Sequence, residues 1–192
     1  MAGYDTEYDV IVCGGGTSGV AAAISAARTG AKTLVIERTG CLGGQMCVSG
    51  PPGFAYARLF NTHGEQDTAG FVEETHARLY KAGHAWPHYH PKHRVPAAYT
   101  FSYVDPEWWM LMIFNMMEEE GVDLLLDSLV VGAVKDNDTV KGVIVENADG
   151  RRELKGKIVI DCTGEAYFAN YAGAETVCVD VKDIQPHTIS FT

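Results

Sequence analysis

Three glycines and one glutamate near the N-terminus have the spacing of a dinucleotide-binding loop. Gly14, Gly16 and Gly19 form a G-x-G-x-x-G pattern, and Glu37 follows Gly14 by 23 residues, close to the expected interval of about 20. In this pattern the first glycine allows a tight turn, the second lets the backbone approach a pyrophosphate, and the third lets a helix pack closely on a strand. The acid can accept hydrogen bonds from a ribose diol and disfavours a 2′-phosphate. This stretch therefore predicts binding of a dinucleotide other than NADP.

The segments around these residues are the ones that such a loop requires. The short apolar run 10–13 predicts a buried parallel strand, and the small-residue stretch 20–30 predicts a helix that Gly30 ends. A second strand over 31–37 ends at Glu37. The N-terminus of the helix would face the phosphate charge. The complete order of strand, glycines, helix, strand and acid distinguishes this pattern from an ordinary glycine-rich turn.

The composition excludes several other classes of protein. The chain has 192 residues, 46% of them hydrophobic, which suffices for one packed core or one core and part of a second. A formal net charge of −10 and a pI of about 5.0 are unfavourable for binding nucleic acid or an anionic membrane surface. No signal-peptide pattern and no apolar run of roughly 20 residues is visible, and the five cysteines are irregularly spaced. We therefore expect a cytoplasmic protein with mostly free thiols.

The rest of the chain departs from the regular strand–helix alternation of an NAD-binding domain. Residues 38–65 are expected to be irregular, and a helix is expected at about 68–82. A second helix should begin at Pro106 after an Asp105 cap and end at Gly121. Its apolar stripe predicts a buried face: Trp109, Met112, Ile113, Met116 and Met117. Later stretches predict strands at 122–127, 129–136, 140–147 and 158–160.

Two clusters of ionisable residues have simple structural explanations. His84, His88, His90 and His93 lie in a proline-containing segment that we expect to be a surface or cleft loop. Substrate contact and metal binding are the alternatives for these histidines, and we predict no metal site. The acidic run 118–120 is expected to be a solvated helix face.

Two motifs resemble those of FAD-dependent oxidoreductases of the glutathione-reductase-like fold. Residues 37–44 fit the E-R-x-x-x-L-G-G loop of one branch of this family, and residues 161–165 fit its late D-A-T-G-D strand end. Cys162 replaces the usual alanine and Glu165 the usual aspartate. The resemblance runs along nearly the whole chain. It implies an α/β glutathione-reductase-like FAD-binding domain, in which a parallel sheet with helices is joined by a β-meander and a substrate domain is only begun.

The resemblance also implies which residues contact FAD. The glycine loop would line the pyrophosphate, Glu37 would bind the adenosine ribose with Arg38 on the adenine side, and the following loop would run toward the ribityl chain and flavin. The backbone near Val130 would meet the adenine. The implied contacts are Gly14, Gly16, Thr17, Ser18, Gly19, Glu37, Arg38, Gly43, Gly44, Gln45, Met46, Val130, Thr163 and Gly164. No catalytic residue and no general base is identifiable.

Cys41 and Cys47 lie on either side of the glycine pair 43–44. Disulfide reductases of this fold carry a C-x-x-x-x-C pair just after the two glycines. Here the second position of that pair is Pro52, and Cys41 precedes the glycines. Three interpretations stay open: two thiols without a redox function, a dithiol relay, and a single reactive Cys47 near the flavin.

Family members are longer than this chain, which sets the expected domain organisation and function. Residues 1–178 would form the FAD-binding domain, and 179–192 would begin a substrate domain or an inter-subunit segment. We expect hydride transfer between an unidentified small organic substrate and FAD, with an additional chain or a C-terminal continuation completing the active site. One alternative is a non-catalytic flavin-holding subunit that needs a partner chain. Another is a thiazole-synthase-like NAD-binding protein, because residues 42–45 resemble a loop seen there.

Overall fold

The computed structural model describes residues 6–48, 54–57, 60, 61, 63, 65–87 and 101–184. The chain forms two compact units. The first comprises the chain up to Gly44 together with Met116–Ile189, and the second consists mainly of Gln45–Asn115. The glycine pattern and Glu37 both belong to the first unit.

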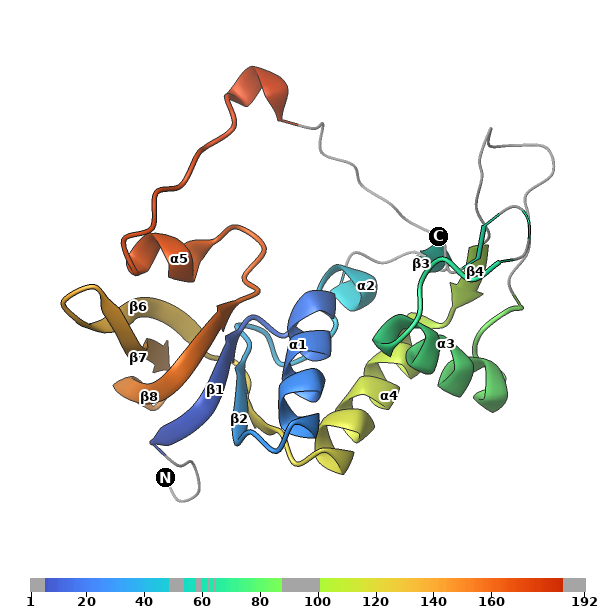
Figure 1. The fold of residues 1–192 in the computed structure, drawn as a ribbon, viewed down its shortest axis with the longest axis horizontal. Coiled ribbons are helices and arrows are strands. Elements are labelled where there is room, and N and C mark those ends of the chain that lie inside the picture. The colour runs from blue at the N-terminus through green and yellow to red at the C-terminus, as the bar shows by residue number, and fades with distance from the viewer. Residues whose placement is uncertain are drawn as a thin grey trace. The chain divides into compact units, whose positions relative to one another are not determined.

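A six-stranded sheet is the framework of the first unit (Figure 1). The strands lie in the order β5-β2-β1-β8-β7-β6. Their bounds are Glu7–Cys13 (β1), Thr33–Ile36 (β2), Asp123–Leu125 (β5), Leu129–Asp136 (β6), Thr139–Asn147 (β7) and Gly150–Asp161 (β8). Strands β5, β2, β1 and β8 are parallel, whereas β8, β7 and β6 form an antiparallel meander. The predicted α/β fold with a parallel sheet and a β-meander is confirmed.

The central strands have the sequences of strands that are covered on both faces. β1 reads EYDVIVC, and all four residues of β2, TLVI, are buried. Continuous apolar runs of this kind are typical of parallel strands inside a sheet. The helix α1 (Thr17–Arg28) joins the two strands and packs on both of them (Figure 1). The predicted strand–helix–strand unit is therefore present, and Glu37 is the first residue after β2.

An apolar cluster joins the parallel strands to the meander. Its members are Tyr8, Ile11, Cys13, Leu34, Ile36, Leu125, Val130, Val143, Val145, Leu154 and Phe168. Full burial of a large aliphatic side chain is worth about 1.5–3 kcal/mol, so this cluster fixes the sheet as one rigid platform. Phe168 comes from the short helix α5 (Tyr167–Tyr171), which packs on β6 and β8. The ends of β1, β2 and β8 are consequently held in register.

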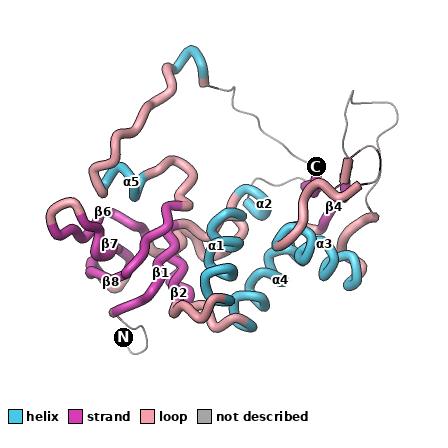
Figure 2. Tube along the Cα trace, in the orientation of Figure 1, coloured by secondary structure: helices cyan, strands magenta, loops and turns pink. Residues whose placement is uncertain are grey.

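The segment after Glu37 is more regular than its sequence suggests. The helix α2 (Gln45–Val48) and the strand β3 (Phe54–Ala57) both fall in the region 38–65 that we expected to be irregular, so that prediction is wrong for these residues. β3 pairs antiparallel with β4 (Phe101–Val104). Figure 2 shows β4 as a strand separate from those of the large sheet. Elements of four residues are too short to show a clear hydrophobic period, which is why the sequence did not reveal them.

Two longer helices agree with their predicted sequence signals. α3 (Phe71–Ala82) starts three residues later than expected because Gly70 has a φ of 75°, outside the helical range. α4 (Pro106–Glu119) begins after Asp105, whose Oδ1 accepts the backbone N–H groups of Glu107 at 3.0 Å and Trp108 at 3.3 Å. Trp109, Ile113, Met116 and Met117 are buried and Met112 is half-buried, so the predicted stripe is a packing face.

The chain after α4 follows the predicted order of strands. The expected strands 122–127, 129–136 and 140–147 correspond to β5, β6 and β7, whereas 158–160 is only the last part of the longer strand β8. A 3-10 turn, Val181–Asp183, is the last described element. Among the described helices, none combines the length and apolar character needed to cross a bilayer.

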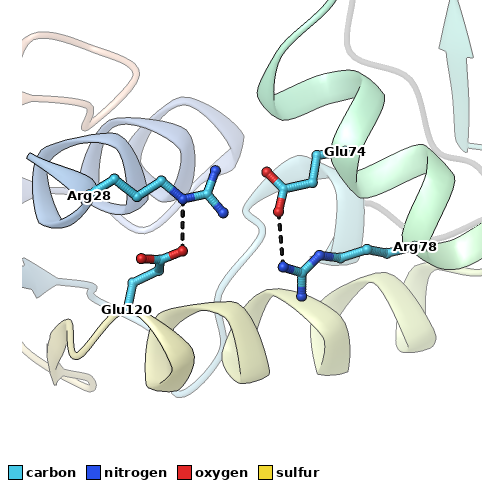
Figure 3. A network of polar contacts seen from close by, with 4 residues as sticks. All are labelled: Arg28, Glu74, Arg78 and Glu120. Atoms are coloured by element: carbon cyan, nitrogen blue, oxygen red, sulfur yellow. Dashed lines mark hydrogen bonds and ion pairs between the residues drawn. The ribbon is translucent and has the colours of Figure 1, made fainter.

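The acidic run after α4 is not uniformly solvated. Glu118 and Glu119 are exposed, but Glu120 Oε1 lies 2.7 Å from Nε of Arg28, the last residue of α1 (Figure 3). In the second unit, Glu74 and Arg78 form an i, i+4 pair on α3 at 2.9 Å (Figure 3). Partly exposed pairs of this type contribute roughly 0.2–1 kcal/mol. The expectation that the whole run is only a solvated face is therefore wrong for Glu120.

Candidate functional site

The carboxyl ends of three neighbouring parallel strands meet at one edge of the sheet. β1 runs into the glycines, β2 runs into Glu37, and β8 runs into the turn 162–164. Cys13 is paired with Ile36 on one side and with Asp161 on the other. Ligands of open α/β sheets bind outside the carboxyl ends of the strands, so this edge is the candidate site.

Two of the glycines are required by the packing of the protein itself. Gly14 has a φ of 99°, and a Cβ at this position would lie 2.4 Å from the carbonyl oxygen of Cys162. A Cβ at Gly19 would lie 1.8 Å from the carbonyl oxygen of Gly14. No side chain can be accommodated at such distances without moving backbone. These two glycines bring β1, α1 and the turn after β8 into direct contact.

Gly16 differs from the other two glycines because the protein does not need a glycine there. Its φ of −69° and ψ of −173° are open to any L residue. A Cβ at Gly16 would meet only the Cα of Gly44, at 4.0 Å. Gly16 caps α1 without a side-chain hydrogen bond, and the first N–H groups of a helix have no intrahelical partner. The space over Gly16 is thus open and lies beside backbone donors.

The carboxylate of Glu37 is buried and is held by the backbone around it. Its Oε2 accepts the N–H of Gly15 at 2.7 Å. Its Oε1 accepts both the N–H and the hydroxyl of Thr39, each at 2.9 Å. Glu37 itself is 8% exposed. A carboxylate offers about four acceptor sites, so these three donors leave room for a further one.

Gly15 and Thr39 are site residues that the sequence analysis did not single out. Gly15 lies inside the glycine run, and a Cβ there would be 2.6 Å from Leu42. Thr39 follows an acid by two residues, a spacing at which a Thr hydroxyl often bonds a local acceptor. That local spacing was the available signal for Thr39. For Gly15 the signal was its place in the middle of the run.

The second glycine pair packs directly on the first loop. The N–H of Gly43 donates to the carbonyl of Gly15 at 2.8 Å, and Gly43 forms an isolated parallel bridge with Gly16. Gly44 has a φ of 53°, and a Cβ there would be 2.9 Å from the Cα of Gly16. The structure thus brings Gly43 and Gly44 together with the glycine loop.

The remaining implied contacts lie in different surroundings. Gln45 is exposed and Met46 is buried, and both belong to α2 in the second unit. Val130 is buried in the apolar cluster and paired with Val145. The segment that leads into its strand bonds the region after β2, because the N–H of Ser128 donates to the carbonyl of Glu37 at 3.0 Å. Val130 therefore follows a segment that is in contact with the site.

The exposed residues at this edge include Thr17, Ser18, Arg38 and Gly164, and Thr163 is half-buried. Tyr167 donates its hydroxyl to Glu165 at 2.9 Å, and this bond raises the pKa of the Tyr167 phenol. The positive charge of Arg38 acts in the opposite direction on that pKa. Arg38 after β2 thus lies within electrostatic reach of the helix that follows β8.

The two cysteines at the strand ends are not activated thiols. Burial raises the pKa of Cys13, and the charge of Asp161 raises it further. Burial also raises the pKa of Cys162, although a hydrogen bond with Ser18 lowers it in part. Since the thiolate is the reactive form of cysteine, raised pKa values make both thiols less reactive.

The cysteines around the glycine pair are both free thiols. Cys41 Sγ lies 3.7 Å from the Thr39 hydroxyl, and Cys47 Sγ donates to the carbonyl of Pro106 at 3.6 Å. A disulfide between them is not formed. Free thiols are also the reduced form of a dithiol relay, so the absence of redox function stays a prediction.

Of the four clustered histidines, only His84 falls within the described residues. Its ring stacks on Trp108 with a centroid distance of 3.7 Å and an interplanar angle of 16°. His88, His90 and His93 lie outside the described residues. In the part of the chain that the structure describes, His84 is thus a packing residue against α4.

Comparison with known proteins identifies the family. A family model described as FAD dependent oxidoreductase matches residues 9–192. The chain belongs to the FAD-dependent oxidoreductase family. The chain is 28% identical over 180 residues to digeranylgeranylglycerophospholipid reductase of Thermoplasma acidophilum, a match that covers 92% of this chain and 44% of that relative. The chain therefore spans less than half the length of this curated relative.

Solved structures share the fold of this chain. A geranylgeranyl bacteriochlorophyll reductase-like protein from Thermoplasma acidophilum matches with a TM-score of 0.64 and 21% identity, over 91% of this chain and 44% of that chain. L-proline dehydrogenase from P. horikoshii matches with a TM-score of 0.57 and 20% identity, over 91% of this chain and 58% of that chain. FAD is the cofactor of the family. The open space over Gly16, the adjacent helix N-terminus and the spare acceptor site on Glu37 fit a pyrophosphate and a ribose.

Replacing Cys41 and Cys47 by serine, singly or together, should change the dissociation constant of FAD by less than about twofold. Substitutions that break no important contact usually change a free energy by less than about 0.5 kcal/mol, which corresponds to roughly this factor. The physical reason is that the two sulfurs are not bonded to each other, and that thiol groups are weak hydrogen-bonding partners. Flavin fluorescence titration measures the affinity. Thiol counting after mild oxidation is the second measurement, and loss of two thiols in the wild type but not in Cys41→Ser would establish a dithiol pair instead.

Proposed function

We propose that this chain is the FAD-binding portion of a flavin-dependent oxidoreductase that transfers hydride between a small organic substrate and FAD. The observation that carries the proposal is the open face of Gly16 beside the buried Glu37 carboxylate, at the carboxyl edge of a parallel sheet. The bound flavin would supply the hydride chemistry, and the protein would supply binding, orientation and electrostatics.

The residues that we propose for FAD binding divide into three groups. The glycine loop and the first turn of α1 would hold the pyrophosphate, Glu37 would bind the adenosine ribose beside Arg38, and the turn after β8 would close over the phosphates. The backbone near Val130 would meet the adenine. The proposed set is Gly14, Gly16, Thr17, Ser18, Gly19, Glu37, Arg38, Gly43, Gly44, Gln45, Met46, Val130, Thr163 and Gly164.

We further propose residues 1–178 as the FAD-binding domain and 179–192 as the start of a substrate domain or an inter-subunit segment. We also propose a cytoplasmic location, because the irregular cysteines are free thiols. The substrate is a separate question, because two relatives with the same fold carry different names: one is a lipid reductase and the other an L-proline dehydrogenase. The flavin determines the type of reaction, whereas the residues around the flavin determine which substrate binds.

Isolated chain 1–192 should bind FAD yet fail to turn over a substrate. The support is that the chain spans only 44% of its relative, so we propose that an additional chain or a C-terminal continuation completes the active site on the side of Gln45 and Met46. Light scattering of the FAD-loaded protein, combined with anaerobic flavin reduction by a panel of candidate donors, tests this. Reduction of its own flavin by a substrate in a monodisperse 20.8 kDa monomer would contradict the proposal.

The same preparation separates the alternatives. A non-catalytic flavin-holding subunit would release FAD on denaturation and exchange electrons only with a partner chain. A thiazole-synthase-like protein would release NAD. Mass spectrometry of the released cofactor therefore distinguishes NAD from FAD. The two FAD alternatives are separated by whether a small organic donor reduces the flavin when any co-purifying chain is retained, or only a partner chain does so.

Glu37→Ala should weaken FAD binding by about 1–3 kcal/mol, the scale of losing hydrogen bonds to a charged group. If Glu37 binds the adenosine ribose, ADP should weaken equally and riboflavin should not. Isothermal titration with the three ligands measures this. Thr39→Val is the matched control for an indirect effect through the loop. It removes one hydrogen-bond donor to Glu37 but leaves the carboxylate in place. Equal ADP affinity of Glu37→Ala and wild type would overturn the assignment.

A further inference from the structure

We propose that Asp161 is a positioning residue of the cofactor site: its carboxylate fixes the turn after β8 against the glycine loop. The proposal rests on the proposed FAD-binding function. Asp161 is the last residue of β8 and lies opposite Cys13, the last residue of β1. Both strands therefore lead into the candidate site at this point.

The carboxylate of Asp161 gathers three donors from the segment that follows it. Oδ1 accepts the N–H of Thr163 at 2.9 Å and the hydroxyl of Thr163 at 2.7 Å. Oδ2 accepts the N–H of Ala169 at 2.8 Å. One side chain therefore ties the turn and the helix α5 to the end of the strand.

Thr163 extends this connection to the beginning of α5. Its hydroxyl oxygen accepts the N–H of Tyr167 at 3.0 Å. The residue at the usual capping position, Ala166, has a φ of 56° and offers no side-chain cap. A non-glycine residue in that region is disfavoured and persists where surrounding bonds hold it. Asp161 and Thr163 together replace the missing cap.

The turn that Asp161 fixes is in contact with the glycine loop. The N–H of Cys162 donates to the carbonyl of Cys13 at 2.8 Å. A Cβ on Gly14 would be 2.4 Å from the Cys162 carbonyl oxygen and 3.1 Å from the Thr163 Cα. The gap between the two segments has no room for a methyl group, so a displaced turn would displace Gly14. Asp161 thus controls the shape of the phosphate loop without any need to touch the cofactor.

The test is a double-mutant cycle on FAD affinity with Asp161→Ala, Thr163→Val and the double variant. Asp161→Ala removes all three accepted bonds and should raise the dissociation constant at least roughly tenfold, whereas Thr163→Val removes only the hydroxyl bonds and should have a smaller effect. The losses should be less than additive in the double variant, because the bond between the Thr163 hydroxyl and Asp161 is lost in both single variants. Thr163→Ser keeps the hydroxyl and should bind FAD more tightly than Thr163→Val. Asp149→Ala, an exposed acid in the β7–β8 turn, is the matched control and should be unchanged.

The outcomes separate this inference from the proposed function. If the wild type does not bind FAD, the proposed function fails. If the wild type binds and Asp161→Ala binds equally well, or the two losses are fully additive, positioning through Thr163 is wrong. If Asp161→Ala does not fold, the FAD affinities of Asp161→Asn and Thr163→Val test the inference instead. Wild-type affinity in both variants would overturn it.

Discussion

Gly16→Val should give a folded protein that no longer retains FAD. The backbone at Gly16 is in the extended region that valine favours, and its added Cβ would have only the Gly44 Cα within 4.0 Å. The new side chain would instead fill the space that the pyrophosphate would occupy at the start of α1. Because phosphate contact depends on close approach to this backbone, we expect a loss of at least a hundredfold in affinity, or roughly 3 kcal/mol.

Flavin absorbance of the purified protein and a titration with FAD measure the loss, and circular dichroism reports the fold. Ser25→Val places the same side chain on the exposed side of α1 and should leave FAD binding intact. Full flavin occupancy in Gly16→Val would show that the phosphate lies elsewhere. Unfolding of Gly16→Val would show that the space over Gly16 is not open.

Gly19→Ala should have the opposite profile: the protein itself should be destabilised. The added Cβ would lie 1.8 Å from the carbonyl oxygen of Gly14, so α1 has to move away from β1. Overpacking typically costs about 1–3 kcal/mol, and a clash with backbone belongs at the upper end of that range. For a chain of this size about 3 kcal/mol corresponds to a fall of roughly 6–12 °C in Tm.

Thermal unfolding of the FAD-free protein measures this effect without involving the cofactor. Gly40→Ala is a suitable control, since a Cβ there meets its nearest neighbour, the carboxylate of Asp127, at 3.4 Å. An unchanged Tm in Gly19→Ala would contradict the close packing of α1 on the loop. Substitutions at two glycines of one motif are thus expected to have different effects. Gly16→Val should lower FAD affinity, whereas Gly19→Ala should lower the stability of the fold.

Local patterns in the sequence were sufficient to predict the parts of the fold that depend on neighbouring residues. The apolar run before Gly14, the small residues of α1 and the acid after β2 predicted the strand–helix–strand unit. Asp105 and Pro106 predicted the start of α4 in the same way, because capping and fixed φ act within one turn. The alternation of apolar and polar residues in 129–136 and 140–147 was enough to predict β6 and β7, because the two-residue period of a strand is visible within the strand itself.

Tertiary structure alone decided which of these pieces meet, since contacts between distant residues leave no local pattern. Val10 pairs with Ile158 across nearly the whole chain, and this pairing brings the Asp161 turn beside Gly14. The glycine motif predicted a ligand role for Gly16 and a packing role for Gly19, and the distances to Gly44 and Gly14 show which backbone atoms make Gly19, but not Gly16, a requirement of the fold. The bond of Glu37 to Gly15 likewise depends on the register of β1 and β2. The physical reason is the same in each case. Local backbone geometry determines which residue type fits a position, whereas the packing of the sheet determines which distant residue it contacts.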